Sequence, residues 1–298
     1  MKCKITGEKI KPFMSFGKMP LANGFLKKKD FGKEFFYNLE IGFSNKLSLF
    51  QINDHPNPPQ MFNSKYPFFT GSSKLMKIHF KNYSDYIKKQ IVNGSKLIEI
   101  GSNDGTFLSN FDKKKFEVIG IEPSKNVSDI AKSNGIRSVN KFFNRNIIKS
   151  IKSYKHNTDI ICGANVICHI PKLTELIKTI DILLSKNGKF IFEEPYMGSM
   201  FKKTSYDQIY DEHIYMFSCT SVKKIFKLFD LNLEDAIPQK THGGSMRYII
   251  SRKKIENKRL NKILDYEKIM NLDNLQSCIN FKKKCEISKK KLNNKINL

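Results

Sequence analysis

The sequence predicts an α/β protein built around a mostly parallel β-sheet with helices on both faces. From residue 96 to about residue 250, short apolar runs alternate with helical patterns. This alternation is typical of parallel strands joined by crossover helices. In the same region, one apolar run leads directly into a turn with two glycines, as strands do where a sheet holds a nucleotide-type ligand.

The elements follow from these patterns in chain order. Residues 1–80 are expected to form a β-rich lobe, because their phenylalanines are separated by Gly, Pro and Lys. A helix is expected over 82–93. The apolar runs predict strands over 96–100, 117–121, 159–164, 189–194, 231–237 and 246–251. Helices are expected over 105–111, 125–134, 172–185 and 220–229, with Gly188 as the C-cap of the helix over 172–185.

The remaining residues, 252–298, are dense in Lys with Ile and Leu at helical spacing. They are expected to form a charged helical extension with a weak apolar face. The predicted domains are therefore a lobe over 1–80, a cofactor-binding domain over 81–251 and the extension over 252–298.

The most informative segment is the strand end and turn Glu99-Ile100-Gly101-Ser102-Asn103-Asp104-Gly105. A second acid, Glu122, stands 23 positions after Glu99 at the end of the next apolar run. Glycines at such a turn let the backbone approach a ligand, and the later carboxylate can accept hydrogen bonds from ribose hydroxyls. The unit is therefore predicted to bind an adenosine-bearing cofactor.

The charges of the turn favour one cofactor over others. A dinucleotide site would have Gly-x-Gly-x-x-Gly, so that a helix N-terminus faces the pyrophosphate. This turn has two glycines, and the acid Asp104 at the expected helix start would repel a phosphate. Three acids around the turn suit S-adenosylmethionine, which is cationic and has no phosphate. An ordinary glycine-containing turn is the alternative, but Glu99 and Glu122 on either side favour the cofactor.

Length and composition narrow the class of protein further. The 298 residues contain no apolar run of 18 residues or more, so no transmembrane helix and no membrane partner are expected. The N-terminus lacks the apolar core of a signal peptide. Six scattered cysteines predict reduced thiols and a cytoplasmic protein.

The net charge of +25 raises the question of a nucleic-acid partner. Only five of the 53 basic residues are Arg, and the charges are spread over the whole length. A protein that reads a groove usually clusters Arg with aromatic side chains. The charge therefore predicts a solvated surface and argues against nucleic acid as a partner.

An ordered set of motifs resembles the class I S-adenosylmethionine-dependent sugar C-methyltransferases. In chain order, the motifs are Pro20-Leu21-Ala22-Asn23, Tyr66-Pro67-Phe68-Phe69-Thr70-Gly71-Ser72-Ser73, Met76-x-x-His79-Phe80, the turn from Glu99 to Gly105, Gly120-Ile121-Glu122-Pro123-Ser124, Asn165-Val166-Ile167-Cys168-His169-Ile170-Pro171, Phe192-Glu193-Glu194-Pro195-Tyr196, Tyr206-Asp207-Gln208-Ile209-Tyr210-Asp211-Glu212-His213 and Thr241-His242-Gly243-Gly244-Ser245-Met246-Arg247-Tyr248. The resemblance covers roughly residues 20–250.

The resemblance implies a Rossmann-like fold with a seven-stranded, mostly parallel sheet. It also implies methyl transfer to a carbon next to the ketone of a nucleotide-linked 4-keto sugar in deoxysugar biosynthesis. Such C-methylation needs a base to remove the carbon-bound proton and a donor to stabilise the enolate oxygen, and no metal. By resemblance, His213 is the base, Tyr210 donates to the oxyanion, Glu212 orients or balances charge, and His169 completes the catalytic set.

The resemblance also implies the binding residues. The cofactor is expected to contact Glu99, Gly101, Ser102, Asn103, Asp104, Gly105, Glu122 and Asn165. The sugar is expected to contact Tyr66, Ser72, His79, Tyr196, His242, Gly243, Ser245 and Arg247. Outside this pattern, Tyr210 could be a core aromatic residue, His169 a core histidine, His79 part of a helix face and the turn after His242 a simple link to a strand.

Two features depart from the family. Members usually carry an N-terminal zinc module with two Cys-x-x-Cys pairs, but here Cys3 is the only cysteine at these positions, and the second pair aligns with Ser44 and Leu47. One thiolate does not make a closed tetrahedral site, so no structural zinc is expected. Members also usually continue into a C-terminal domain that helps to hold the nucleotide sugar. This chain ends before such a domain is complete, and a separate C-terminal partner is one way to supply it.

Two other functions remain open at this point. One is a methyltransferase of the same fold that acts on another small molecule or on RNA. The other is an inactive, truncated module kept for binding. The motif residues Glu99, Tyr210 and His213 argue against the second, and the early chain end argues for it.

Overall fold

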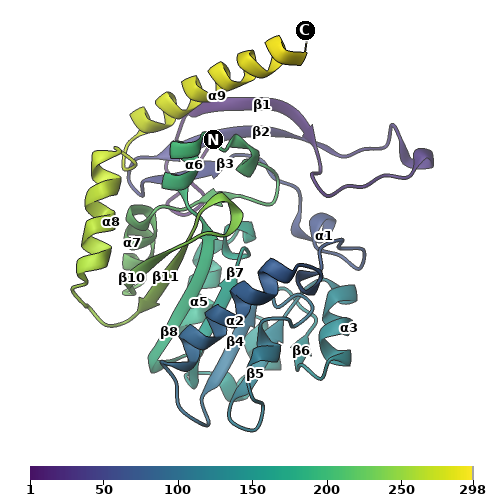
Figure 1. Cartoon of the computed structure of the whole chain (residues 1–298), viewed down its shortest axis with the longest axis vertical. Coiled ribbons are helices and arrows are strands. Elements are labelled where there is room, and N and C mark those ends of the chain that lie inside the picture. Colours follow the sequence, from purple (N-terminus) through teal and green to yellow (C-terminus); the bar gives the residue numbers. More distant parts are fainter. Residues whose placement is uncertain (297–298) are drawn as a thin grey trace.

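A seven-stranded sheet in the order β10-β11-β8-β7-β4-β5-β6 forms the centre of the computed structural model, which describes residues 1–296 (Figure 1). Its strands are β4 (Lys96–Ile100), β5 (Glu117–Ile121), β6 (Ser138–Val139), β7 (Thr158–Ala164), β8 (Leu184–Pro195), β10 (Asn232–Gln239) and β11 (Ser245–Ser251). Strands β4 to β8 pair in parallel, whereas β11 runs antiparallel to both β8 and β10. The predicted mostly parallel, seven-stranded sheet is therefore confirmed.

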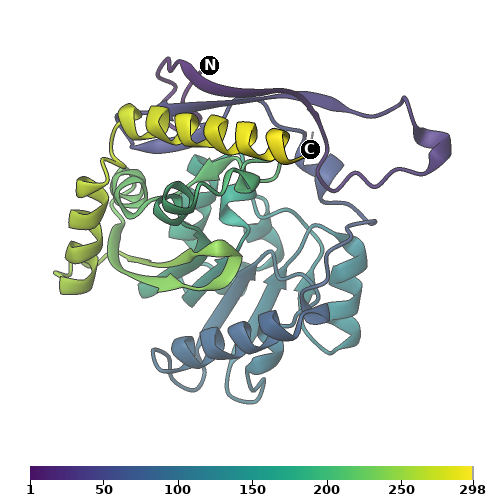
Figure 2. The ribbon, with the colours of Figure 1, turned by 45° about the horizontal axis from the view of Figure 1, so that its top comes forward.

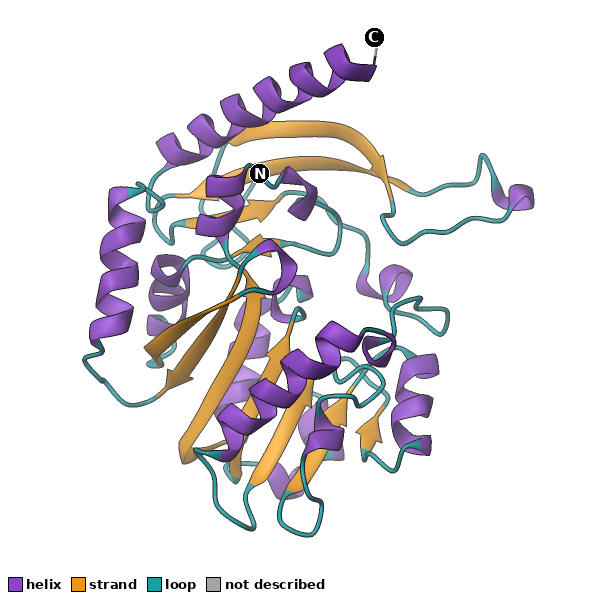
Figure 3. Ribbon diagram, in the orientation of Figure 1, coloured by secondary structure: helices purple, strands orange, loops and turns teal. Residues whose placement is uncertain are grey.

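Helices cover both faces of this sheet (Figure 3). They are α1 (Pro58–Met61), α2 (Lys74–Lys88), α3 (Lys125–Ser133), α4 (Ile147–Ser150), α5 (Leu173–Leu183), α6 (Met197–Lys203), α7 (Cys219–Lys227), α8 (Lys258–Ile269) and α9 (Leu275–Ile296). No helix within residues 1–296 is both long enough and apolar enough to span a bilayer.

Alternating side chains on the strands build two apolar cores. On β4, Leu97 packs in one core with Phe80 and Tyr83 of α2. Ile98 and Ile100 point to the opposite face, into the core that includes α5 and α7. Because successive side chains of a strand face opposite sides, a continuous apolar run fits a strand buried on both faces.

The order of the strands creates a crevice at the carboxyl edge of the sheet. The chain runs from β4 outward to β5 and β6, and then returns to place β7 on the other side of β4. Open α/β sheets bind ligands where the strand order reverses in this way. Here that position lies above the ends of β4 and β7. The glycine turn follows β4 directly, and Asn165 follows β7.

A second, antiparallel sheet forms the N-terminal lobe in the order β1-β2-β3-β9. Its strands are β1 (Pro12–Pro20), β2 (Phe36–Ser44), β3 (Leu49–Ile52) and β9 (Tyr215–Met216), so the last strand comes from the later part of the chain. Helix α9 packs on β1 and β2, and the segment between these two strands extends away from the body (Figure 2).

Three local predictions are wrong. The helix expected over 105–111 is a turn followed by a 3-10 helix, Leu108–Asn110, which ends after one turn because Phe111 is extended (φ −100°, ψ 133°). Helix α2 begins at Lys74 instead of residue 82, since Ser73 caps its N-terminus. Gly188 is not a helix cap but part of β8, where a Cβ atom would lie 2.5 Å from the Thr158 carbonyl oxygen.

Candidate active site

A cavity of about 860 Å³ lies at the carboxyl edge of the sheet, above the ends of β4, β5 and β7. It brings together residues that are far apart in the sequence. Of the predicted site residues, those that line it are Tyr66, Gly101, Asn103, Glu122, Asn165, His169, Tyr210, Glu212, His213 and His242. One cavity therefore collects both the cofactor-type residues of the turn and the acid–base residues of the later motifs.

The turn after β4 depends on its glycines. Gly101 has φ +66°, and a Cβ atom there would lie 2.7 Å from Val166 Cγ2. Gly105 has φ +79°, and its Cβ would lie 2.9 Å from a side-chain carbon of Ile136. Both positions therefore need glycine for backbone conformation and for space. Asn103, between them, is also left-handed at φ +47°, a conformation that Asn tolerates better than most residues.

Glu122 holds the turn from the neighbouring strand end. Its Oε2 accepts a hydrogen bond from the Asn103 amide at 3.0 Å, and its Oε1 accepts one from the Ser124 amide at 2.7 Å. The side chain is buried at the wall of the cavity. Burial raises its pKa, and the two amide hydrogen bonds oppose this shift. Its carboxylate is thus fixed at the position expected for an acceptor of ribose hydroxyls.

Asn103 and Asp104 have a role that the sequence did not reveal. Their side chains accept hydrogen bonds from the amides of Thr70 at 3.0 Å and Gly71 at 2.7 Å. The Asn103 Nδ2 group also donates to the Phe68 carbonyl oxygen at 3.1 Å. These contacts fasten the segment before α2 over the turn. The acid at the turn is therefore explained by a local backbone contact, besides any effect on a ligand.

Two buried polar atoms near the turn have no hydrogen-bond partner within residues 1–296. They are Oε2 of Glu99 and Oγ of Ser102. Burial, followed by the charges of Asp104 and Glu122, raises the pKa of Glu99 well above its usual range. Neither Glu99 nor Ser102 lines the cavity. The buried Glu122 carboxylate and Gly101 do, and an acceptor beside a closely approaching backbone fits the hydroxyl donors of a ribose. The residues present therefore fit S-adenosylmethionine.

His213 lies on the opposite side of the cavity. Its Nδ1 is 2.8 Å from the Gln208 carbonyl oxygen, which can only accept, so Nδ1 carries the proton. Its Nε2 then accepts from the Tyr210 hydroxyl at 3.0 Å. Burial lowers the pKa of His213 to about 4. The imidazole is thus neutral at physiological pH, in one tautomer, with its lone pair on the atom next to Tyr210.

His169 stacks against His213, with ring centroids 5.3 Å apart. Phe62 stacks on His169 at 5.7 Å. The Nε2 atom of His169 is buried and has no partner in residues 1–296. Burial lowers the pKa of His169 well below its usual range, and His213 adds to the effect. A neutral imidazole with an unused nitrogen at a cavity wall is suited to bind an acceptor molecule.

The N-terminal lobe contributes to the same wall. The Asn23 amide group donates to Oε1 of Glu212 at 2.5 Å, and the Ala22 amide donates to Oδ2 of Asp211 at 3.3 Å. Burial raises the pKa of Glu212 to about 7. The early Pro20-Leu21-Ala22-Asn23 motif is therefore explained by contact with the Tyr210-to-His213 segment, 189 positions away.

Comparison with known proteins identifies the family. A family model described as a methyltransferase domain matches residues 77–236, which is more than half of the chain. The chain belongs to the methyltransferase family that uses S-adenosylmethionine. A second model, described as a putative zinc binding domain, matches residues 3–62 of this methyltransferase. The first range contains strands β4 to β8 of the central sheet, and the second contains β1, β2 and β3 of the N-terminal sheet.

One curated relative is C-methyltransferase NovU of Streptomyces niveus, 25% identical over 249 residues. The match covers 82% of this chain and 59% of NovU, so the chain spans about three fifths of that relative's length. Among solved structures, the CurJ carbon methyltransferase aligns with a TM-score of 0.46, 14% identity, and 61% and 56% of the two chains covered. Magnesium protoporphyrin IX methyltransferase of Synechocystis PCC 6803, with bound SAM, aligns with a TM-score of 0.45 and 10% identity. This alignment covers 59% of this chain and 79% of that one.

Glu194 is a site residue of the methyltransferase that the sequence predictions omitted. Its Oε1 accepts from the amides of Val166 at 3.0 Å, Ile167 at 2.6 Å and Cys168 at 3.3 Å. Burial raises its pKa to about 7. Glu194 therefore shapes the loop that carries His169. The sequence did contain a signal for it, because Glu193 and Glu194 are adjacent acids in an apolar strand. Acids in a buried strand are rare unless they have partners.

Several predicted acceptor-binding residues lie outside the cavity. His79 Nε2 and the Arg247 guanidinium both contact Glu193, at 2.5 Å and 2.6 Å, in a buried cluster. Arg247 also lies over the rings of Tyr83 and Tyr86. Its charge is thus matched inside the protein. The backbone links the cluster to the cavity, because the Glu193 carbonyl oxygen accepts from the Asn165 amide at 2.9 Å.

The other predicted contacts are local. The Tyr196 hydroxyl donates to Glu267 of α8 at 2.9 Å. Ser72 and Ser245 donate to nearby carbonyl oxygens, and Gly243 lies in the 3-10 turn after β10. His242, in the same turn, lines the cavity and forms a hydrogen bond with the Asn165 side chain. The predicted set thus divides into a group at the cavity and a group that supports its walls.

One group of side chains within residues 1–296 could hold a metal ion. Ligand atoms of Cys168, His169 and His213 all lie within 4.8 Å of one another. Burial and the neighbouring Glu194 raise the pKa of the Cys168 thiol well above its usual range. In the N-terminal lobe, by contrast, Ser44, predicted to stand at a ligand position of the zinc module, donates its hydroxyl hydrogen bond to Glu8. The prediction that the protein holds no zinc therefore has to be tested at two places: the N-terminal lobe around Cys3, and the group of Cys168, His169 and His213.

Proposed function

We propose that this methyltransferase transfers a methyl group to the enolised carbon next to the ketone of a nucleotide-linked 4-keto sugar. The observation that carries the proposal is the neutral His213, hydrogen-bonded to Tyr210 and stacked on His169, in the same cavity as the cofactor turn. Such a cavity offers a base and hydrogen-bond donors beside a methyl donor. The relationship to a protein named as a C-methyltransferase supports carbon as the acceptor atom.

The residues that would hold the cofactor are those of the turn and the next strand end. S-adenosylmethionine supplies an electrophilic methyl group on a positively charged sulfur. Gly101 lets the backbone come close, and Glu122 offers its carboxylate to the ribose. The acidic side chains Glu99 and Asp104 stand behind the turn, outside the lining of the cavity, and Asp104 holds the Gly71 and Thr106 amides.

At the other end, His213 Nε2 would take the proton from the carbon next to the ketone. The Tyr210 hydroxyl, now bonded to that nitrogen, would turn to donate to the developing enolate oxygen. His169 offers its unused Nε2 to the same oxygen or to a sugar hydroxyl. Glu212, held by Asn23, would set the charge around Tyr210.

The first step makes this proposal testable without methyl transfer. The wild type should exchange the acidic carbon-bound proton of a suitable nucleotide-linked 4-ketohexose with deuterium from solvent, even without a methyl donor. The His213→Ala variant should lose both exchange and methyl transfer by on the order of a hundredfold or more. Tyr210→Phe should slow exchange and methyl transfer less than His213→Ala does, because the base remains.

Binding of S-adenosylhomocysteine, measured by calorimetry, controls for folding and should stay near normal in both variants. Exchange that survives in His213→Ala and disappears in His169→Ala would give His169 the role of the base. No exchange in any form, with cofactor binding intact and several sugars tried, would favour a different acceptor for this fold.

A further inference from the structure

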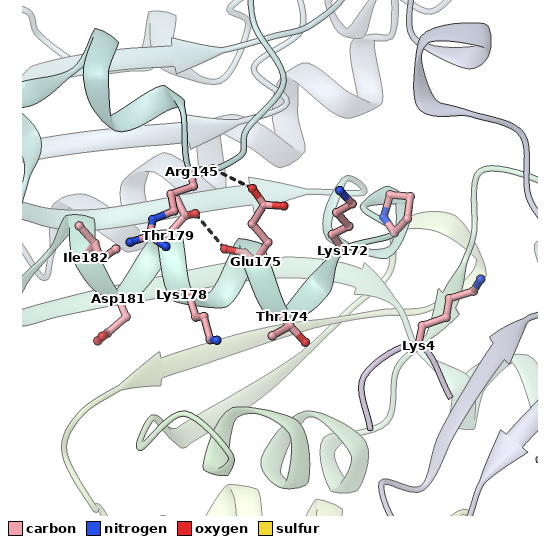
Figure 4. A pocket seen from close by; sticks show the side chains of 10 residues that line it. Lys4, Arg145, Lys172, Thr174, Glu175, Lys178, Thr179, Asp181 and Ile182 are labelled. Carbon is pink, nitrogen blue, oxygen red and sulfur yellow. Dashed lines mark hydrogen bonds between the residues drawn. The ribbon is translucent and has the colours of Figure 1, made fainter. Parts of the chain in front are cut away.

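A second cavity, of about 710 Å³, lies along helix α5 (Figure 4). It is lined by Lys4, Arg145 and residues of the segment 171–182, and we call it the α5 groove. It shares Pro171, Lys172 and Glu175 with the wall of the catalytic cavity. Because Pro171 follows His169 by two positions, the groove begins beside the stacked imidazoles.

The α5 groove is lined by four cationic side chains, Lys4, Arg145, Lys172 and Lys178. They come from three separate parts of the chain: Figure 4 shows Arg145, Lys172 and Lys178 along helix α5, and Lys4 on the N-terminal segment. Within residues 1–296, none of the four forms an ion pair. The Lys4 ammonium group donates only to the Asn53 carbonyl oxygen, at 2.8 Å.

Two acids also line the groove, but they offset only part of these charges. Asp181 is paired with Arg252, at 2.5 Å, so its charge is already matched. Oε1 of Glu175 accepts from the backbone amide of Arg145 at 3.2 Å, which leaves the guanidinium group of Arg145 for other partners. The groove therefore keeps an excess of positive charge beside the active site.

The cofactor does not explain this charge. S-adenosylmethionine is itself cationic and has no phosphate, so four cations beside its cavity would disfavour it. The charge therefore suits the methyl acceptor. Arg binds phosphate groups through two parallel hydrogen bonds, and Lys binds them as a point charge. The Thr174 side chain in the same groove adds a hydroxyl donor.

We propose that the α5 groove binds the diphosphate of the nucleotide-linked acceptor, with Arg145 and Lys172 as its main contacts. The choice of acceptor rests on the proposed function. In a nucleoside-diphosphate sugar, the diphosphate is joined directly to the sugar ring, so its subsite must adjoin the place where the ring reacts. The shared wall at Pro171, Lys172 and Glu175 provides this arrangement.

Calorimetry with uridine diphosphate, uridine and inorganic pyrophosphate tests the subsite without any reaction. Uridine diphosphate and pyrophosphate should bind the wild type, more weakly as salt increases, whereas uridine should not. The double variant Arg145→Ala/Lys172→Ala should bind uridine diphosphate at least tenfold more weakly. Lys186→Ala removes an exposed lysine that lines neither cavity, and its affinity should stay unchanged. S-adenosylhomocysteine should bind all forms alike.

Two results would overturn the proposal: equal affinity of the wild type and the double variant for uridine diphosphate, or no binding of either phosphate compound to the wild type. The proposed function fails separately. If a nucleotide-linked 4-ketohexose is methylated with the same KM by the wild type and the double variant, the function holds and the subsite is wrong. If uridine diphosphate binds through Arg145 and Lys172 but no 4-ketohexose reacts, the subsite holds and the acceptor sugar is wrong.

Discussion

The Tyr210 hydroxyl donates a hydrogen bond to Nε2 of His213 at 3.0 Å, and Nδ1 of the same ring donates to the Gln208 carbonyl oxygen at 2.8 Å. The two contacts fix one tautomer of a neutral imidazole. An isolated histidine would be about half protonated near pH 6.5, but burial lowers the pKa of His213 to about 4. The imidazole of His213 is therefore unprotonated over a wide pH range, although the low pKa also makes it a weaker base.

This arrangement predicts an unusual pH profile for kcat/KM. His213 should stay neutral as the pH falls from about 8 to about 5, so it should cause no loss of rate in that range. Burial raises the pKa values of Glu212 and Glu194 to about 7, and of these two acids Glu212 lines the cavity, whereas Glu194 does not. Any inflection near pH 7 should therefore disappear in Glu212→Gln. An inflection near pH 6.5 that persists in this variant would contradict the low pKa of His213.

Glu122→Ala should weaken the binding of S-adenosylhomocysteine at least tenfold. Hydrogen bonds to a charged group contribute about 1.5–3 kcal/mol each, and the ribose would lose two. Glu122→Gln keeps one oxygen acceptor and should have a smaller effect. Calorimetry measures both, with thermal unfolding as a check, because Glu122 also holds the Asn103 and Ser124 amides. Equal affinity in Glu122→Ala and the wild type would mean that the site is assigned wrongly.

Gly101→Ala should destabilise the fold more than Gly94→Ala does. Both glycines have positive φ, +66° and +89°, so both substitutions strain the backbone, by about 1 kcal/mol. Only at Gly101 would the new Cβ also meet Val166, 2.7 Å away, whereas nothing lies within 4 Å at Gly94. Overpacking should add about 1–3 kcal/mol and displace the loop that carries His169. Urea unfolding compares the two; equal losses would show that Val166 moves away without cost.

Protein purified without chelator should contain far less than one zinc per chain. Cys3 is the only cysteine within the zinc-type lobe, and Ser44 there bonds Glu8 instead of a metal. Metal analysis by mass spectrometry measures this directly. A stoichiometric metal would contradict the prediction, and the Cys168→Ser variant would then locate it. Loss of the metal in that variant would place it at Cys168, His169 and His213, the group whose ligand atoms lie within 4.8 Å of one another.

Much of the α/β region follows from the sequence alone. The strands β4 and β5 have the predicted bounds, because a continuous apolar run between turn residues is the direct signature of a strand buried on both faces. The cofactor turn was also identifiable, since its glycines and acids are close together in the chain. The absence of a regular helix after the turn was not identifiable, because the extended conformation of Phe111, which ends the 3-10 helix after one turn, does not show in the pattern of apolar residues.

Only the tertiary structure decided which predicted site residues line the cavity and which lie outside it. From the sequence, Arg247 and His169 were equally suited to meet the acceptor. In the structure, Glu193 on the adjacent strand takes up the charge of Arg247, whereas the Nε2 atom of His169 is left at the wall of the cavity without a partner. Local sequence fixes which groups a strand end presents. Which of them stay available depends on partners that are distant in the chain, and only packing brings those partners into contact.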